Sequence, residues 1–140
     1  MNFFKTIFLV FLGGTLGTLV RFAIALTVPN LGDFPTSTFL VNVFGSFLIG
    51  ILYAILVKRR KRDPEGATDL YRIFGSGVLG GFTTYSLFAF ENARLIDSSD
   101  IVLTLCYGIG AVAAGVIACW LGLHLAKTFA KNAKNGRDNG

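Results

Sequence analysis

The polar residues that could do chemistry in this sequence are concentrated in two short segments, each surrounded by apolar residues. In the first segment Thr38, Asn42 and Ser46 recur every four residues, with Gly45 beside them. Helical spacing of this kind places the three side chains on one face. Two uses stay open for that face. It can hold neighbouring helices together by hydrogen bonds, as Asn and Ser often do in membrane bundles, or it can line a polar path.

The second segment, residues 80–88, has the sequence Gly-Gly-Phe-Thr-Thr-Tyr-Ser-Leu-Phe. Glycines and clustered hydroxyl residues weaken a helix. An interruption would free carbonyl oxygens that lipid cannot satisfy, so a cation, another chain or water must meet them. A simple kink packed on a neighbour is the alternative. Tyr85 and Phe88 share a face, where their ring edges suit an anion or serve only for packing.

The elements that position these residues are helices that span a membrane. The chain has 140 residues, of which 53% are hydrophobic and 15% charged, against about 25% charged in soluble domains. Charges cluster between four apolar segments, each able to cross a hydrocarbon core of about 30 Å as a helix. Strand-like alternation is absent. We predict an all-α membrane domain over 1–126, with helices at about 3–28, 36–57, 71–92 and 101–126, the third broken mid-membrane, and a basic polar tail over 127–140.

The distribution of basic residues predicts how the chain is inserted. With four crossings, both termini and the loop between the second and third helices share one side. That side holds every Lys and Arg except Arg21 and Arg94. The positive-inside rule then places both termini in the cytoplasm, at the plasma membrane. We interpret Lys58–Arg62 as a topology signal, with an anionic-lipid site as the second interpretation. Arg21, inside the first helix, snorkels outward, attracts anions to an entrance or ties the helix to another chain.

Several classes of function are disfavoured by what the sequence lacks. It has no Walker-type loop, no metal-ligand cluster and no nucleophile–base pair, so we expect no catalytic residues and no enzyme activity. The acidic residues fall in loops, in the tail or at helix ends, and we expect none within a span. A proton-coupled exporter normally needs a carboxylate there. Tyr107 in the fourth helix either gives a hydroxyl to a pathway or anchors the helix at an interface.

Three blocks of residues resemble a known family over nearly the whole chain. They are Gly14–Phe22, with the pattern Gly-x-x-Gly-x-x-x-Arg, Thr38–Gly50, with Thr-x-x-Val-Asn-x-x-Gly-Ser, and Gly80–Phe88. Each block is weak alone. All three, in order on a four-helix chain of this length, resemble the CrcB/Fluc fluoride channels. The chain departs from that family at Tyr85, where Phe is usual, and in the fourth helix, whose polar track is thin.

The resemblance implies passive, fluoride-specific conduction that lowers cytoplasmic fluoride and its toxicity, through pores along the boundary of an antiparallel dimer. It implies a structural sodium ion, not transported, on the main-chain oxygens of Gly80 and Thr83. The implied fluoride path passes Asn42, Tyr85 and Phe88. Because a strongly hydrated anion needs donors, we add hydroxyl groups to the predicted path, those of Thr38, Ser46, Thr84, Ser86 and Tyr107.

The charge bias bears on the partner of such a dimer. An antiparallel homodimer needs copies inserted both ways, which a weak bias favours, whereas this bias is heavy. We therefore predict a similar, oppositely oriented chain as the partner, with a homodimer as the other possibility. Two further hypotheses for the function stay open: a proton-coupled exporter of the small multidrug type, and a non-conducting structural subunit of a paired channel.

Overall fold

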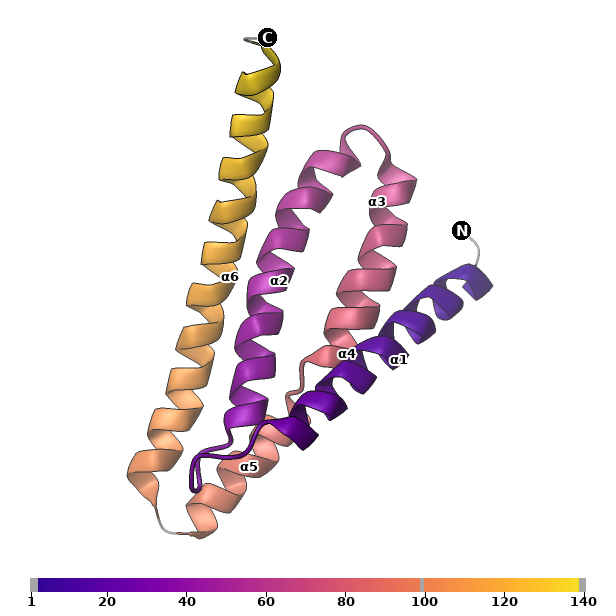
Figure 1. Ribbon diagram of the computed structural model, residues 1–140. Helices are drawn as coiled ribbons and strands as arrows, with labels where there is room; N and C mark the ends of the chain where they lie inside the picture. The colour runs from indigo at the N-terminus through magenta and orange to yellow at the C-terminus, as the bar shows by residue number, and fades with distance from the viewer. Residues whose placement is uncertain (1–2, 99, 139–140) are drawn as a thin grey trace.

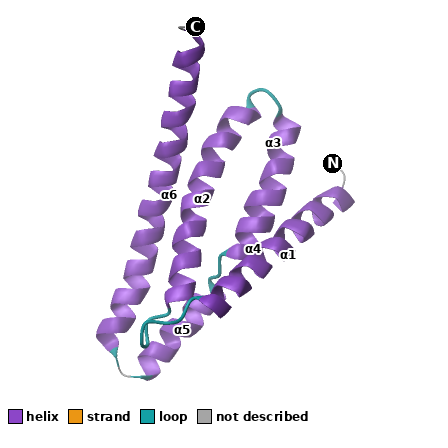
Figure 2. Cartoon of the chain, viewed as in Figure 1, coloured by secondary structure: helices purple, strands orange, loops and turns teal. Residues whose placement is uncertain are grey.

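The computed structural model describes residues 3–98 and 100–138, with residues 131–138 as backbone only. All regular secondary structure in this part of the chain is helical (Figure 2). Its elements are α1 Phe3–Thr27, α2 Thr36–Arg60, α3 Pro64–Leu70, the π-helix η1 Tyr71–Leu79, α4 Gly80–Phe82, α5 Ser86–Asp97 and α6 Ile101–Asp138. Of the tail predicted over 127–140, residues 139–140 and the side chains of 131–138 lie outside the described part.

Four helical stretches within the described residues are long and apolar enough to cross a membrane. They are α1, α2, the composite third segment Pro64–Asp97, and Ile101–Ala130. The prediction of an all-α, multi-pass membrane protein is therefore confirmed. The start of α1, the loop after α2 and the end of α6 lie at one end of the bundle (Figure 1). The loops that follow α1 and α5 lie at the other end, as four crossings require.

The helices pack mainly as two pairs. α2 lies along α6, while α1 crosses η1 and α4 (Figure 1). Where α1 crosses η1 and α4, the backbones are in contact. A Cβ atom on Gly17 would overlap the carbonyl oxygen of Val78, and one on Gly81 would overlap that of Gly14. Small residues permit this closeness in membrane helices, so α1 fixes one face of the third segment.

The third segment changes helix type along its length. α3 starts at Pro64 after an N-cap, Asp63, whose carboxylate accepts a hydrogen bond from the Gly66 N–H at 2.8 Å. This is the usual way to satisfy a free N–H at a helix start. The chain then adopts the π form over Tyr71–Leu79, much longer than the single-turn π-bulges usual in proteins. It returns to the α form at Gly80 and leads directly into the candidate site.

Candidate functional site

The third segment is interrupted at residues 83–85. Thr83 has an extended backbone, with φ −78° and ψ 160°, and α5 begins at Ser86. The Thr83 hydroxyl and N–H both donate to the carbonyl oxygen of Leu79, at 2.8 and 3.0 Å. These bonds end the helix before the interruption, which is the first half of the segment. The Thr84 hydroxyl accepts from the Leu87 N–H at 3.2 Å and caps the second half. The interruption predicted from the glycine and hydroxyl residues is therefore present.

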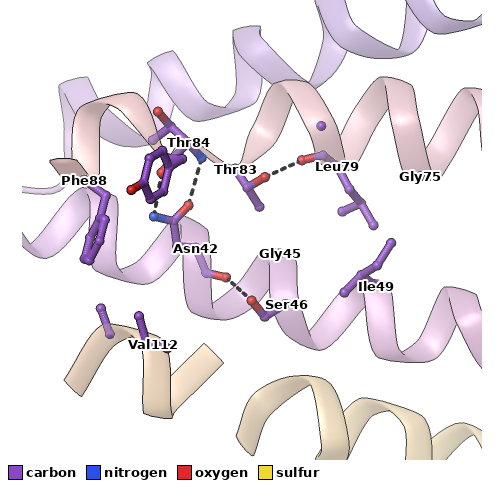
Figure 3. A pocket seen from close by; sticks show the side chains of 13 residues that line it. Asn42, Gly45, Ser46, Ile49, Gly75, Leu79, Thr83, Thr84, Phe88 and Val112 are labelled. Atoms are coloured by element: carbon purple, nitrogen blue, oxygen red, sulfur yellow. Dashed lines mark hydrogen bonds between the residues drawn. The ribbon is translucent and has the colours of Figure 1, made fainter. Parts of the chain in front are cut away.

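Asn42 on α2 binds both main-chain polar groups of Thr84. Its amide nitrogen donates to the Thr84 carbonyl oxygen at 2.9 Å, and its amide oxygen accepts from the Thr84 N–H at 2.8 Å (Figure 3). One of the two amide hydrogens is thus committed to Thr84, and the other is left for a further acceptor. Asn42 therefore holds the interruption against α2, a role that the polar stripe alone did not reveal.

These bonds leave two main-chain carbonyl oxygens without their usual helical hydrogen-bond donors. In a continuous α-helix the Thr84 N–H would bond to the Gly80 oxygen, and the Leu87 N–H to the Thr83 oxygen. Here the first N–H is directed to Asn42 and the second to the Thr84 hydroxyl. The main-chain oxygens of Gly80 and Thr83 thereby lose their ordinary helical donors. Such oxygens need another positive partner when they are away from water.

A pocket of about 440 Å³ lies beside the interruption, between α2, the third segment and α6 (Figure 3). Figure 3 shows Asn42, Thr83 and Thr84 around it, with Phe88 at one end and Ile49 and Leu79 at the other. The residues that line the pocket are Asn42, Gly45, Ser46, Ile49, Gly75, Leu79, Gly80, Thr83, Thr84, Tyr85, Phe88, Ala111 and Val112. The pocket thus combines amide, hydroxyl and main-chain groups with aromatic and aliphatic side chains.

Aromatic rings continue from the pocket toward the end that carries the α1–α2 loop. The ring centroids are 6.2 Å apart for Tyr85 and Phe88, 5.3 Å for Phe88 and Tyr107, and 5.5 Å for Tyr107 and Phe34. Tyr107 is 0% exposed, whereas Tyr85 is 80% exposed. The row therefore begins at the surface of the chain, passes through the core at Tyr107 and ends at the half-buried Phe34.

Glu91 lies within a candidate membrane span, where we expected no acidic residue. It is inside α5, within the candidate span Pro64–Asp97, and half-buried. Its carboxylate accepts hydrogen bonds from the hydroxyls of Thr38 and Tyr107, both at 2.7 Å. The prediction that the acidic residues lie only in loops, the tail or helix ends was therefore wrong, because α5 continues to Asp97, past the helix end predicted at about residue 92. The sequence did contain a signal for this position: Glu91 follows Phe88 by three residues, a spacing that places both on one face of a helix.

A smaller polar recess, of about 170 Å³, lies at the same end of the bundle. Glu91 lines it, together with Asp33 and Arg94. Glu91 therefore lies between this recess and the buried hydroxyls of Thr38 and Tyr107. The recess holds charges of both signs, so it does not carry the uniformly positive lining that would by itself concentrate anions.

The remaining predicted site residues divide into two groups. Ser46 and Ser86 lie at the site: the Ser46 hydroxyl donates to the Asn42 carbonyl oxygen at 2.8 Å, and the Ser86 hydroxyl is 3.3 Å from that of Thr84. Arg21 does not line the pocket, so its role as an entrance charge stays a prediction. Within the described residues no His, Cys, Asp or Glu side chains gather in threes that could hold a metal.

Together these features define a multi-pass membrane protein with a polar pocket beside an interrupted helix. The model of a family described as "CrcB-like protein, Camphor Resistance (CrcB)" matches residues 8–123, and the chain belongs to that family. The resemblance stated from the three sequence blocks is confirmed, since all three fall within the matched residues.

Individual relatives match over most of their length and carry one name, fluoride-specific ion channel FluC. The protein of Novosphingobium aromaticivorans is 40% identical over 124 residues, which cover 85% of this chain and 94% of that protein. The Flavobacterium psychrophilum protein is 36% identical over 125 residues, 88% of this chain and 98% of that protein. The Pseudomonas fluorescens protein is 39% identical over 119 residues, 82% and 91% of the two chains.

Proposed function

We propose that this chain is a subunit of a fluoride-specific channel that lets fluoride leave the cytoplasm passively and so lowers its toxicity. The observation that carries the proposal is the Asn42–Thr84 bridge beside a polar pocket, in a chain whose relatives are named fluoride-specific ion channels. Fluoride is small and strongly hydrated, so a pore must replace its water with hydrogen-bond donors. The free amide hydrogen of Asn42 is such a donor.

The proposed route uses the Asn42 amide, several hydroxyl groups and the aromatic row. Fluoride passes Asn42 and the edges of the Tyr85 and Phe88 rings, which carry partial positive charge. Hydroxyl groups at either side complete the lining, namely those of Thr84, Ser86, Ser46, Thr38 and Tyr107. Each hydroxyl has one hydrogen to donate. Those of Thr38 and Tyr107 are donated to Glu91 and that of Ser46 to the Asn42 carbonyl oxygen, so these three hydroxyls would donate to fluoride only by releasing their present acceptors. Arg21 attracts the anion to an entrance.

A structural sodium ion completes the proposal. The main-chain oxygens of Gly80 and Thr83 would hold it, and oxygen ligands are those that hard cations prefer. The loss of their helical donors to Asn42 and Thr84 supports this assignment. The ion would balance the carbonyl dipoles without being transported. Replacing sodium by a large organic cation during purification is expected to lower the unfolding temperature, and an unchanged temperature would remove the ion from the proposal.

The assembly we propose is an antiparallel dimer, most simply with a similar chain of opposite orientation and otherwise with a second copy. Tyr85, 80% exposed beside the pocket, supports a partner because its hydroxyl is costly against lipid. The basic end of the bundle, with both termini, faces the cytoplasm. Side-specific labelling of a tagged terminus is expected to report one face only, and equal signals from both faces would favour the homodimer.

Ion flux from liposomes tests the function directly. We expect fluoride efflux with no requirement for a pH gradient and no matching chloride efflux, measured for this chain alone and with its partner. Phe88→Leu should reduce the flux, since it removes the ring edge, whereas Phe90→Leu, which changes a 59% exposed ring, should not. Flux that depends on a pH gradient would instead indicate an exporter. Flux from the partner alone, together with flux from the pair that Phe88→Leu leaves unchanged, would make this chain a structural subunit.

A further inference from the structure

A second pocket lies at the end of the bundle that carries most of the positive charge, away from the proposed fluoride route. Its volume is about 350 Å³. The residues that line it come from the end of α2, the loop after α2 and the later part of α6, and they are Ala54, Ile55, Lys58, Arg59, Arg62, Ala126 and Ala130. The pocket therefore has an apolar floor and a basic rim.

The pocket exists because α2 and α6 are in close contact on one side of it and then leave space. A Cβ atom on Gly50 would overlap the Cys119 carbonyl oxygen, and one on Gly122 would overlap that of Phe47. One turn further on, Ala54 and Ala126 stand at the equivalent positions. Methyl side chains do not fill the space between the helices, so an apolar slot remains at the edge of the bundle.

The basic rim has more positive charge than its ion pairs neutralise. Arg59 is paired with Asp63, with 3.2 Å between the guanidinium nitrogen and the carboxylate oxygen. No ion pair of Lys58 or Arg62 occurs with another residue whose side chain the structure describes. Arg60 and Lys61, next to them in sequence, do not line the pocket. The rim is thus a particular pair of cations over an apolar slot, beyond the general positive charge of this loop.

We propose that this pocket binds an anionic phospholipid of the surrounding bilayer. The phosphate lies on Lys58 and Arg62, and the first part of one acyl chain lies against Ala54, Ile55 and Ala126. Charge complementarity selects the anionic headgroup, and basic pockets between helices at a membrane surface have this chemistry. The apolar floor selects a lipid over free phosphate, because a soluble anion would leave the slot unfilled.

Native mass spectrometry of the purified, delipidated protein tests the headgroup contact. With added phosphatidylglycerol we expect bound-lipid peaks that phosphatidylcholine does not give. Lys58→Gln with Arg62→Gln should weaken phosphatidylglycerol binding about tenfold or more, since each cation contributes substantially at such a site. The control, Arg60→Gln with Lys61→Gln, removes the same charge outside the pocket and should change binding by less than about twofold. Equal loss in both pairs would overturn the site in favour of diffuse attraction.

A second pair of variants tests the acyl slot with every charge retained. Ala126→Leu fills the pocket floor and is expected to reduce phosphatidylglycerol binding, whereas Ala113→Leu, on an exposed part of α6, is not. Circular dichroism should give the same helix content for both variants. Unchanged lipid binding by Ala126→Leu would overturn the proposal, and so would displacement of the lipid by inorganic phosphate alone.

Discussion

The two faces of the third membrane segment differ in the room that they leave. Against α1 the segment has none, since added Cβ atoms on Gly17 or Gly81 would meet backbone oxygens. Against α2 and α6 it leaves a pocket of about 440 Å³, lined by the groups that the interruption exposes. The comparison indicates that one face is an anchor and the other a site. A helix can be interrupted and still be held in place if its opposite face is fixed by close backbone contact.

The largest expected effect is on the anchored face. Gly17→Ala places a methyl group against the Val78 carbonyl oxygen, so the helices must separate, at a cost of about 1–3 kcal/mol or more. We expect a strongly lowered unfolding temperature and loss of fluoride flux. Gly14→Ala is the matched control on the same helix, because its Cβ would lie 4.0 Å from the Gly77 oxygen. Equal effects of the two substitutions would show that the close contact between α1 and the third segment is not the cause.

A smaller effect is expected on the open face from Asn42→Asp. The substitution keeps the size of the side chain but replaces the donor to the Thr84 carbonyl oxygen by a carboxylate oxygen. The resulting repulsion costs about 1–3 kcal/mol at the interruption and places a negative charge on the anion route. Fluoride flux should fall by at least about tenfold, a factor that 1.4 kcal/mol produces. Retained flux in liposomes would remove Asn42 from the proposed route.

The cap of α5 gives a more local effect. Thr84→Val removes the hydroxyl that accepts from the Leu87 N–H, which should cost about 1 kcal/mol of folding free energy. Thr84→Ser keeps the hydroxyl and should restore most of that stability. Thermal unfolding in detergent measures both variants. If Ser is no better than Val, the hydroxyl does not hold the second half of the segment.

A still smaller effect is expected for Tyr85→Phe, which restores the residue usual in the family. Because the Tyr85 side chain is 80% exposed, stability of the single chain should change by less than about 0.5 kcal/mol. The ring edge is kept, so we expect fluoride flux to change by less than about threefold. Electrode recordings of efflux would test this. A complete loss of flux would mean that the hydroxyl itself binds the ion.

The least effect is expected at Asp63, remote from both faces. The Gly66 N–H and then the Arg59 guanidinium lower the pKa of the Asp63 carboxyl below its ordinary value of 3.8. A lowered pKa in the folded chain means that the contribution to stability is complete above about pH 4 and is lost as the pH falls through the lowered pKa. Asp63→Asn keeps a capping oxygen and should flatten this acid-side dependence. An identical pH profile for both chains would contradict the assignment.

Much of the fold was predictable from the sequence, because apolar length and the clustering of charges determine which segments cross a membrane. The polar stripe of Asn42 and the weak helix over residues 80–88 were also predictable, since both follow from local spacing and composition. The partner of Asn42 was not, because it depends on how α2 and the third segment pack. The π form of η1 was not predicted either. The interior position of Glu91 was missed because the helix was expected to end at about residue 92, whereas α5 continues to Asp97.

The double hydrogen bond between Asn42 and Thr84 restricts the relative motion of the two walls of the pocket. A single bond would act as a pivot, whereas two bonds side by side prevent both swivelling and sliding unless both break together. Alternating access by rocking would require that rupture in each cycle. A wall assembled in this way is better suited to a passage whose dimensions stay constant while ions move through it.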